Sequence, residues 1–302
     1  MRARTRPCPG CGSADDSRVF AERNVEPAQL DRLSYASRKT PEYLHHRLVS
    51  CPGCGLVYAS PAPAAEELVR AYQDAGFDAG EESGRAAEVY AEELGRFLEA
   101  LPDRRGALDI GAGDGAFLER LAAGGFTELV GLEPSAEPVR AAKPAVRSLI
   151  RRDLFDPAAF PPASLSLVTC FQTLEHVPDP RELCRGARAV LRPGGALFVV
   201  CHNLEALSAR VLGRKSPIFD VEHLQLFAPG SLRALLERSG FAKVEVWPIF
   251  NRYPLHYWTR LLPLPRGLKD SLLPALRASG LGRLMVTLPA GNMAAVGFRL
   301  EP

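Results

Sequence analysis

Residues Ala107 to Leu121 read ALDIGAGDGAFLERL, and this stretch decides the fold. Its first four residues, Ala107 to Ile110, form the short apolar run that is typical of a buried parallel strand. Three glycines then predict a tight turn, and Phe117, Leu118 and Leu121 follow at helical spacing. The sequence therefore predicts a strand, a glycine-rich loop and a helix, in that order.

The glycine-rich loop predicts a nucleotide-type pocket. Gly111, Gly113 and Gly115 have no side chain that would keep a ligand away from the backbone N–H groups at the helix N-terminus. In the dinucleotide fingerprint the third glycine comes three positions after the second, whereas Gly115 comes two after Gly113. Asp109, just before the turn, disfavours a pyrophosphate and favours the ammonium group of an amino-acid-bearing cofactor. The spacing favours S-adenosylmethionine over NAD, although a glycine-rich turn by itself also occurs in ordinary loops.

A second acidic residue supports this interpretation. The segment ELVGLE, from Glu128 to Glu133, is predicted to be the next strand. Glu133 ends this strand about twenty residues after the glycines, where doubly wound folds place the carboxylate that binds both ribose hydroxyls. The two acidic positions therefore agree on one cofactor site.

Two segments further along the chain extend the pattern. SLSLVTCFQTLEHVPDP covers Ser164 to Pro180, and ARAVLRPGGALFVVCHN covers Ala187 to Asn203. They predict a buried strand, a short helix, a longer helix, a Pro-Gly-Gly turn and another buried strand. With the glycine-rich loop and Glu133, these segments resemble the class I S-adenosylmethionine-dependent methyltransferases, over Glu88 to Leu300. The resemblance implies an α/β fold with a Rossmann-like, seven-stranded sheet.

Residues after the third and fourth strands are further candidates for the cofactor site. Val146 to Ile150 is expected to be the third strand. The resemblance implies that Asp153 accepts a hydrogen bond from the adenine amine and that the backbone N–H of Leu154 donates to an adenine ring nitrogen. Strand four, Leu165 to Phe171, leads to Gln172, which is expected near the methionine part of the cofactor because ligands lie outside the carboxyl ends of strands. The alternatives are a helix cap for Asp153 and a solvated loop amide for Gln172.

Two histidines are candidate catalytic bases, because the pKa of histidine lies near the working pH. His176 follows Glu175 in the LEHVPDP segment, where the alternative is that both residues shape the loop and the cofactor site. His223 follows Glu222 in a segment that resembles the EHLxxF element of zinc-ribbon-bearing methyltransferases, including those that methylate carbon atoms of nucleotide-bound deoxysugars. In that sugar group an equivalent histidine acts as base, so His223 is the first choice; alternatively it closes the loop by hydrogen bonding.

The resemblance to the sugar C-methyltransferases is incomplete. Those proteins carry a further C-terminal domain, which we expect this chain to lack because it ends too soon after the last predicted strand. This departure disfavours methylation of a sugar carbon.

A duplicated cysteine motif predicts a metal site near the N-terminus. The pentapeptide CPGCG begins at Cys8 and again at Cys51, and each copy places two thiolates on a tight turn. Two such turns complete a tetrahedral four-sulfur zinc site of the zinc-ribbon type, with Cys8, Cys11, Cys51 and Cys54 as its ligands. Four cysteines leave no open coordination position, so we expect the zinc to be structural. The alternative is that these are unrelated buried cysteines.

The composition is that of a globular protein, and we expect this protein in the cytoplasm. The chain has 302 residues, of which 46% are hydrophobic. Its formal charge is only +2, so its overall charge does not predict binding to nucleic acid or acidic lipid. No apolar run reaches the length of a membrane span, and the N-terminal MRARTRPCPG lacks the apolar core of a signal peptide. Seven cysteines, an odd number, argue against a disulfide framework.

Three regions are expected along the chain. Residues 1–63 are the predicted zinc ribbon, 64–105 a connector with lid helices, and 106–302 the cofactor-binding methyltransferase domain. Within the connector, Gly76 to Gly84 is polar and glycine-rich, which predicts a mobile segment, and Arg85 to Leu101 has the apolar spacing of a helix. The edge of the sheet is expected to be a hairpin of Ala242 to Phe250 and Ala294 to Leu300.

An insertion over residues 252–290 separates these two edge strands. It contains one acidic residue, Asp270, and several basic residues, with aromatic and leucine residues between the basic ones. The basic residues are Arg252, Arg260, Arg266, Lys269, Arg277 and Arg283. Such a basic amphipathic segment suits a peripheral membrane contact, a phosphate-bearing substrate or a homodimer. The alternative is a helical hairpin packed on the core, with its arginines in water.

These observations predict methyl transfer from S-adenosylmethionine to a small-molecule, saccharide or lipid-linked acceptor. One alternative is an RNA base methyltransferase that holds RNA with its zinc ribbon, although the ribbon is not strongly basic and no specific nucleic acid is expected. A second alternative is a zinc-ribbon interaction protein without catalysis. The intact acidic and glycine positions disfavour that alternative.

Overall fold

The central sheet of the molecule is built from the predicted apolar runs. The computed structural model describes residues 3–4, 6–14, 17–26, 29–30, 34–36, 42–77, 80–262 and 264–300. In it, seven strands follow the order β12-β13-β10-β9-β6-β7-β8. They are β6 (Arg105–Ile110), β7 (Thr127–Leu132), β8 (Ile150–Arg151), β9 (Leu165–Phe171), β10 (Leu191–His202), β12 (Ala242–Pro254) and β13 (Met285–Phe298). Neighbours pair in parallel except that β13 runs antiparallel to β10 and β12, so the expected Rossmann-like sheet is present.

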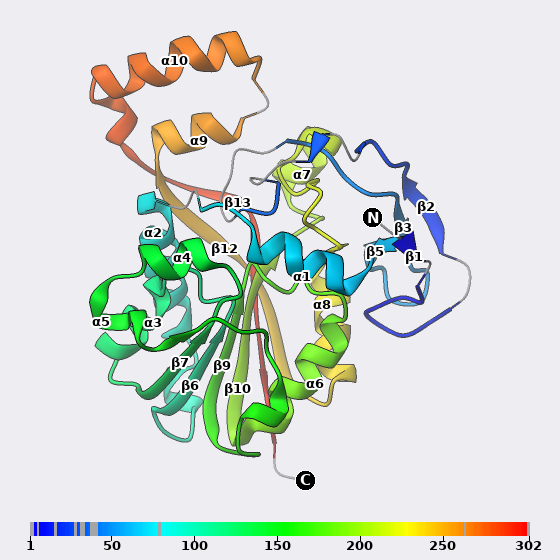
Figure 1. Cartoon of the computed structure of the whole chain (residues 1–302), viewed down its shortest axis with the longest axis vertical. Coiled ribbons are helices and arrows are strands. Elements are labelled where there is room, and N and C mark those ends of the chain that lie inside the picture. Colours follow the sequence, from blue (N-terminus) through cyan, green and yellow to red (C-terminus); the bar gives the residue numbers. More distant parts are fainter. Residues whose placement is uncertain are drawn as a thin grey trace.

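Helices cover both faces of this sheet (Figure 1). Side chains alternate along a strand, so Ala107 and Phe198 pack in one apolar cluster and Leu108 and Leu197 in the other. The first cluster includes residues of α2 (Gly80–Leu94) and α3 (Ala116–Ala123), and the second includes residues of α6 (Pro180–Val190) and α8 (Pro229–Arg238). Short helices α4 (Ala136–Ala141) and α5 (Pro144–Arg147) and the 3-10 turn η3 (Pro157–Ala159) connect the strands β7, β8 and β9.

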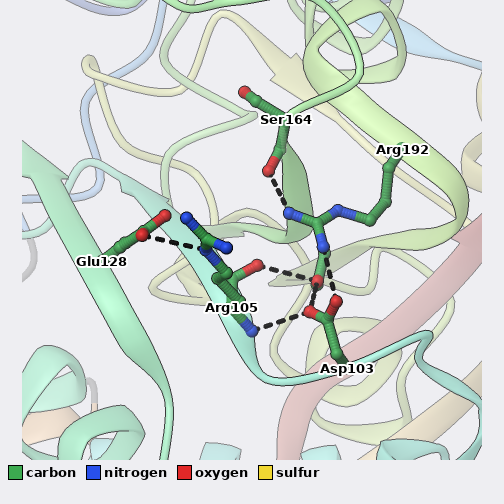
Figure 2. A network of polar contacts seen from close by, with 6 residues as sticks. Asp103, Arg105, Glu128, Ser164 and Arg192 are labelled. Atoms are coloured by element: carbon green, nitrogen blue, oxygen red, sulfur yellow. Dashed lines mark hydrogen bonds and ion pairs between the residues drawn. The ribbon is translucent and has the colours of Figure 1, made fainter.

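A polar network ties together the amino ends of β6, β9 and β10 (Figure 2). The carboxylate of Asp103 accepts from the backbone N–H of Arg105 at 2.8 Å and from the hydroxyl of Ser166. It also lies 2.5 Å from a guanidinium nitrogen of Arg192, which donates in addition to the carbonyl of Ser164. These bonds hold the end of the sheet opposite the glycine-rich loop, so the network is structural and leaves the carboxyl ends of the strands for a ligand.

The N-terminal region forms a second, smaller sheet that includes a strand from the distant part of the chain. Its strand order is β11-β4-β3-β2, from β2 (Arg18–Ala21), β3 (Leu48–Ser50), β4 (Val57–Ala59) and β11 (Gln225–Leu226). A further strand pair joins β1 (Ala3–Arg4) to β5 (Ala62–Pro63). Because β11 begins two residues after His223, the N-terminal sheet is hydrogen-bonded to the segment that carries the predicted base.

Most of the remaining helices lie around the carboxyl ends of the strands (Figure 1). They are α1 (Ala65–Gln73), α7 (Leu207–Leu212), η4 (Gly213–Lys215), α9 (Leu255–Leu261), α10 (Arg266–Ala278) and η5 (Leu281–Arg283), whereas η2 (Leu98–Ala100) comes shortly before the amino end of β6. Figure 1 shows α9 and α10 as an arm that projects beyond this end of the sheet. Among the described helices, none is both long and apolar enough to span a bilayer.

Four details of the expected secondary structure are wrong. Residues 146–150 do not form one strand: Pro144, with its fixed φ, starts the helical turn α5, and only Ile150–Arg151 pair with β7. The segment from Gly76 to Gly84 is not all connector, because α2 already begins at Gly80. The helix expected from Arg85 to Leu101 ends at Leu94, and η2 follows it. Both edge strands extend into the insertion, with β12 ending at Pro254 and β13 starting at Met285.

Candidate functional site

The glycine-rich loop is positioned by close packing as well as by backbone conformation. Gly111, Gly113 and Gly115 all have positive φ angles, of 79°, 56° and 76°. A Cβ at Gly111 would lie 2.1 Å from the hydroxyl oxygen of Thr173, so no larger residue fits there. A Cβ at Gly113 would meet no atom within 4 Å, because this position faces open space in the pocket. The loop therefore lets a ligand reach its backbone at Gly113.

Glu133 stands at the carboxyl end of β7 and holds the loop from the neighbouring strand. Its carboxylate accepts from the backbone N–H of Gly113 at 3.0 Å and from that of Ser135 at 2.9 Å. Burial raises the pKa of Glu133, and the two backbone donors act in the opposite direction. The arrangement leaves a carboxylate beside the glycine-rich loop, as the binding of ribose hydroxyls requires.

Asp109 is a buried carboxylate with one side-chain partner among the bonds that the structure gives it. Its exposed fraction is 2%, and the Thr169 hydroxyl donates to it at 2.7 Å. Burial raises the pKa of Asp109 to about 7, and the nearby charge of Glu133 adds to this shift. A buried acid of this kind fits a cationic group such as an ammonium, which would stabilise its charged form.

Two more of the residues predicted to bind the cofactor, Gln172 and Asp153, follow β9 and β8. Gln172 adopts a left-handed backbone conformation with φ of 48° at the end of β9, and its amide nitrogen is buried without a protein partner. Such an orphaned donor fits an acceptor atom of a ligand. Asp153 and Leu154 are exposed on the pocket wall, and the Leu154 N–H donates to the Asp153 carboxylate at 2.8 Å. An adenine ring would therefore compete with Asp153 for the Leu154 N–H.

A single cavity of about 1300 Å³ collects the predicted ligand-binding and catalytic residues. All nine of these residues line it: Asp109, Gly111, Gly113, Glu133, Asp153, Leu154, Gln172, His176 and His223. The volume exceeds the roughly 300–1,000 Å³ of common ligand pockets, so the cavity has room for a cofactor and an acceptor together.

The two predicted bases lie side by side within a cluster of polar side chains. The rings of His176 and His223 are 5.0 Å apart between centroids, and His202 lies 4.9 Å from His223. The Nδ1 atom of His223 lies 2.8 Å from the carbonyl of Ile218, which can only accept, so Nδ1 carries the proton and Nε2 is the basic nitrogen. His223 therefore has the tautomer that a base needs.

Tyr72 and Glu222 anchor His176 in this cluster. The Tyr72 hydroxyl lies 2.9 Å from His176 Nδ1, and a carboxylate oxygen of Glu222 lies 3.8 Å from the same nitrogen. Burial raises the pKa of Tyr72 well above its usual value, so its hydroxyl stays protonated at neutral pH. The ligand atoms of His176, Glu222 and His223 lie within 4.8 Å of one another, a spacing that also suits a metal ion. The short bond from Tyr72 to His176 favours a hydrogen-bonded cluster over a metal site.

Sequence reasoning missed three polar residues of the pocket. His202 ends β10, and its Nδ1 lies 2.8 Å from Asn292 Oδ1; Asn292 in turn donates to Asn251 at 3.1 Å. Asn251 is buried, and its amide nitrogen has no protein partner. The position of His202 after a buried strand is a signal that was present in the sequence. Asn251 and Asn292 carry no such signal, because the pairing of β12 with β13 brings them together.

The guanidinium of Arg6 joins the N-terminal sheet to both histidine-bearing segments. It donates to the carbonyls of Ala59 at 3.1 Å, Pro178 at 2.6 Å and Leu224 at 3.0 Å. It also donates to the side-chain oxygen of Gln225 at 3.1 Å. Burial lowers the pKa of Arg6 to about 10, so it stays charged at neutral pH. Pro178 follows His176 by two residues and Leu224 follows His223 by one, so Arg6 fixes their relative position.

Gln225 adds hydrogen bonds to the loop that carries His176. Its amide nitrogen donates to the carbonyls of Leu174 and Val177, both at 2.8 Å, and its side chain is fully buried. The backbone N–H of Leu224 donates to the carbonyl of Glu175 at 2.8 Å. These bonds span the loop on both sides of His176. The geometry of the two histidines therefore depends on residues from three distant parts of the chain.

The four N-terminal cysteines form two matching turns whose sulfurs converge. Gly12 N–H donates to the Cys8 carbonyl at 2.7 Å, and Gly55 N–H donates to the Cys51 carbonyl at 2.9 Å. The Sγ atoms are 3.6 Å apart between Cys8 and Cys54 and 3.5 Å apart between Cys11 and Cys51. A zinc ion with four sulfurs at about 2.3 Å has S···S edges of about 3.8 Å. The donor set and its spacing therefore fit a tetrahedral zinc site.

Comparison with known proteins identifies relatives for the central part of the chain. A family model described as "Methyltransferase domain" matches residues 83–246, just over half of the chain. The ubiquinone biosynthesis O-methyltransferase of Xanthomonas euvesicatoria pv. vesicatoria is 30% identical over 152 residues, which are 46% of this chain and 63% of that protein. The protein of the same name from Klebsiella pneumoniae is 38% identical over 97 residues, 30% of this chain and 40% of that protein. The chain thus spans less than two thirds of the length of these curated relatives.

A solved structure supports the fold. A chain from the complex between the Haloferax volcanii Trm112 methyltransferase activator and a methyltransferase superposes with a TM-score of 0.50. The match covers 79% of this chain and 99% of that chain, at 16% sequence identity. At this identity the likeness concerns the fold alone.

The raised pKa of Asp109 predicts a pH-dependent affinity for S-adenosylmethionine. As the pH falls through about 7, the Asp109 carboxylate takes up a proton and loses the charge that attracts an ammonium group. We expect calorimetry to give binding about tenfold weaker at pH 6 than at pH 8. In the Asp109→Asn variant, binding should be weak at both pH values. An equal pH dependence in that variant would assign the titration to another group.

The hydrogen bonds of Arg6 predict that its replacement lowers methyl transfer but leaves cofactor binding almost unchanged. Arg6→Met should leave the affinity for S-adenosylmethionine within about twofold, because Arg6 does not line the cavity. Transfer of the methyl group should fall at least about tenfold, since misplacing the two histidines disturbs the acceptor side. Arg185→Met, at an exposed position on α6, is the matched control and should change neither quantity. Equal losses of affinity and transfer would mean that Arg6 supports the whole fold instead.

Proposed function

The chain belongs to the methyltransferase-domain family, and on that premise we propose that it transfers the methyl group of S-adenosylmethionine to a small-molecule acceptor. The observation that carries this proposal is the shared cavity. Buried carboxylates and the glycine-rich loop line one part of it, and the histidine cluster lines another. When bound, S-adenosylmethionine supplies an electrophilic methyl group on a sulfonium, so the protein has to align the acceptor and exclude water.

The cofactor residues are proposed to act through complementary charges and hydrogen bonds. Asp109 binds the ammonium group, Glu133 the ribose hydroxyls, and Gln172 the methionine part. The bare backbone at Gly111 and Gly113 lets the cofactor lie against the loop. Asp153 and Leu154 complete the adenine side. The supporting evidence is that all these positions border one cavity.

His223 is proposed as the base that removes a proton from an acceptor hydroxyl. Its basic Nε2 atom belongs to a ring whose Nδ1–H is held by the Ile218 carbonyl, which keeps the required tautomer. His176 is proposed as a positioning group beside it, bonded to Tyr72. Glu222, near His176, favours the positive charge that a histidine of this cluster gains on taking the proton. The relatives' name, which specifies O-methyltransferases, supports a hydroxyl as the methylated group.

The acceptor is proposed to combine a hydroxyl with an apolar part. The histidines and Asn292 supply polar contacts, whereas Tyr257, Trp258 and Leu261 supply apolar walls to the same cavity. This lining favours a lipid-linked acceptor over a free saccharide.

A cytoplasmic location stays a prediction. The division into a ribbon (1–63), connector and lid (64–105) and catalytic domain (106–302) is also part of the proposal. The lid role is supported by α1 and α2, whose Leu68 and Tyr90 line the cavity.

The four cysteines are proposed to hold a structural zinc. Cys8 and Cys51 pack in the same apolar cluster as Leu183 and Leu232 of the catalytic sheet's helices. A zinc ion at this place would therefore stabilise the ribbon where it joins the core, and through β4 the segment of β11. It would take no part in the chemistry, since all four coordination positions are filled by sulfur.

The acceptor proposal predicts where a labelled methyl group goes. The protein is incubated with methyl-labelled S-adenosylmethionine and a cell extract, and label is counted in the RNA, protein, lipid and small-molecule fractions. We expect label in the lipid or small-molecule fraction, and a loss of about a hundredfold or more in His223→Gln. His256→Gln is the matched control, because His256 also bonds a carbonyl through Nδ1 but lies outside the cavity lining. Label in RNA would support the RNA methyltransferase instead. Intact cofactor binding with no label in any fraction would support the interaction protein.

The zinc proposal predicts about one zinc ion per chain in the purified protein, measured by elemental analysis. Cys11→Ser combined with Cys54→Ser should remove the metal and lower the thermal unfolding temperature, because two of four ligands are lost. Cys201→Ala, at a buried cysteine of β10, is the control and should keep the metal. Unchanged zinc content in the double variant would place the ion elsewhere.

A further inference from the structure

We infer that the entrance of the cavity docks on an anionic lipid bilayer and takes its acceptor from that surface. The inference deepens the proposed function by naming how the acceptor reaches the site, and to that extent rests on it. It starts from two segments at the same end of the molecule: residues 204–216, with α7 and η4, and residues 255–288, with α9, α10, η5 and the start of β13 (Figure 1). We call these two segments together the rim.

Large apolar side chains are exposed along the rim. Leu207 and Val211 on α7 are 74% and 73% exposed, and Leu281 and Leu284 are each 60% exposed. The full set on the rim is Leu207, Val211, Leu262, Leu268, Leu281, Leu284, Met285 and Leu288, which is most of the large exposed apolar residues in the described part of the chain. Apolar surface gathered in this way marks an interaction site.

Half of these exposed apolar residues also line the cavity. Leu207, Val211 and Leu212 from α7 line it, and so do Leu261 and Leu262 from the end of α9 together with Leu288 from β13. α7 packs against β13, and α9 packs against α10 and η5, so the two segments form one structure with the end of the sheet. A surface that covers the rim would therefore face the cavity directly.

The charge of the rim indicates which kind of surface it binds. By sequence the rim carries eight basic residues, Arg210, Arg214, Lys215, Arg260, Arg266, Lys269, Arg277 and Arg283, against Glu205 and Asp270. The whole chain has a formal charge of only +2, so the rest of the molecule is net acidic. Apolar side chains interleaved with Lys and Arg are the pattern of segments that lie in the interface of anionic bilayers.

A second copy of the chain fits this surface less well. In a two-fold dimer the same patch faces itself, so the basic residues of one rim would meet those of the other. Arg252, predicted as part of the basic insertion, does not belong to this surface, because it pairs with Glu92 at 2.9 Å. The excess positive charge thus lies on the rim itself, where lipid phosphates can neutralise it.

Vesicle binding tests the inference without any need for catalysis. The full-length protein is sedimented with vesicles of phosphatidylcholine containing about 30% phosphatidylglycerol, and with pure phosphatidylcholine vesicles, at low and high salt. We expect binding to the anionic vesicles that weakens in salt. Leu281→Ser/Leu284→Ser and Arg277→Gln/Arg283→Gln should each lower the partition coefficient at least about tenfold. None of these four residues lines the catalytic cavity.

Matched controls separate the possible outcomes. Val19→Ser/Leu300→Ser removes exposed apolar residues outside the rim and should bind vesicles like the wild type. Equal loss in this control, or no binding to anionic vesicles by the wild type, would overturn the inference. So would light scattering that shows a dimer which Leu281→Ser/Leu284→Ser converts to a monomer. Affinity for S-adenosylmethionine, measured on every variant, reports the proposed function separately: vesicle binding without cofactor binding would contradict that function and leave the docking surface standing.

Discussion

The hydrogen bonds of the Arg6 guanidinium are the contacts on which the positions of His176 and His223 depend. One planar cation holds the carbonyls of Ala59, Pro178 and Leu224, and so joins the N-terminal sheet to the two segments that carry the histidines. A buried guanidinium without these acceptors would be costly, so the three segments have to meet at this point. Gln225 supports the same region, because its side-chain amide donates to carbonyls on both sides of His176. The residues predicted to bind the cofactor, by contrast, lie in strands of the central sheet or just after them.

The central sheet and the N-terminal region thus support different parts of the cavity wall. The sheet supplies Asp109 and Glu133 at adjacent strand ends, and a glycine-rich loop between them, without help from the N-terminus. His176 and His223 lie on loops, which need support from outside to keep a fixed geometry. Strand β11, which begins two residues after His223, provides it by joining the N-terminal sheet. The N-terminal region is thus part of the framework of the site, and its cysteines lie where that framework meets the core.

Local sequence patterns predicted the glycine-rich loop and the acidic strand ends, for a physical reason. A glycine with positive φ, such as Gly111, and an acid that ends a buried strand, such as Glu133, are each required by a feature of the parallel sheet that recurs at fixed spacing. The polar residues around the two histidines were predicted less completely. His176 and His223 were recognised from their segments, but Asn251 and Asn292 face the cavity only because two edge strands pair across a long insertion. Periodicity also misjudged residues 146–150, where a proline starts a helical turn within an apolar run.

The sequence by itself determined the order of strands and helices, the glycine-rich loop, the acidic strand ends and the paired cysteine turns, because each depends on residues close together in the chain. Only the tertiary structure decided which distant groups meet. It placed Arg6 beside the segments of both histidines, set His223 next to His176 and His202, and brought the exposed Leu207, Leu262 and Leu288 to the wall of one cavity. These contacts join residues separated by tens to hundreds of positions, and only packing and strand pairing fix such distances.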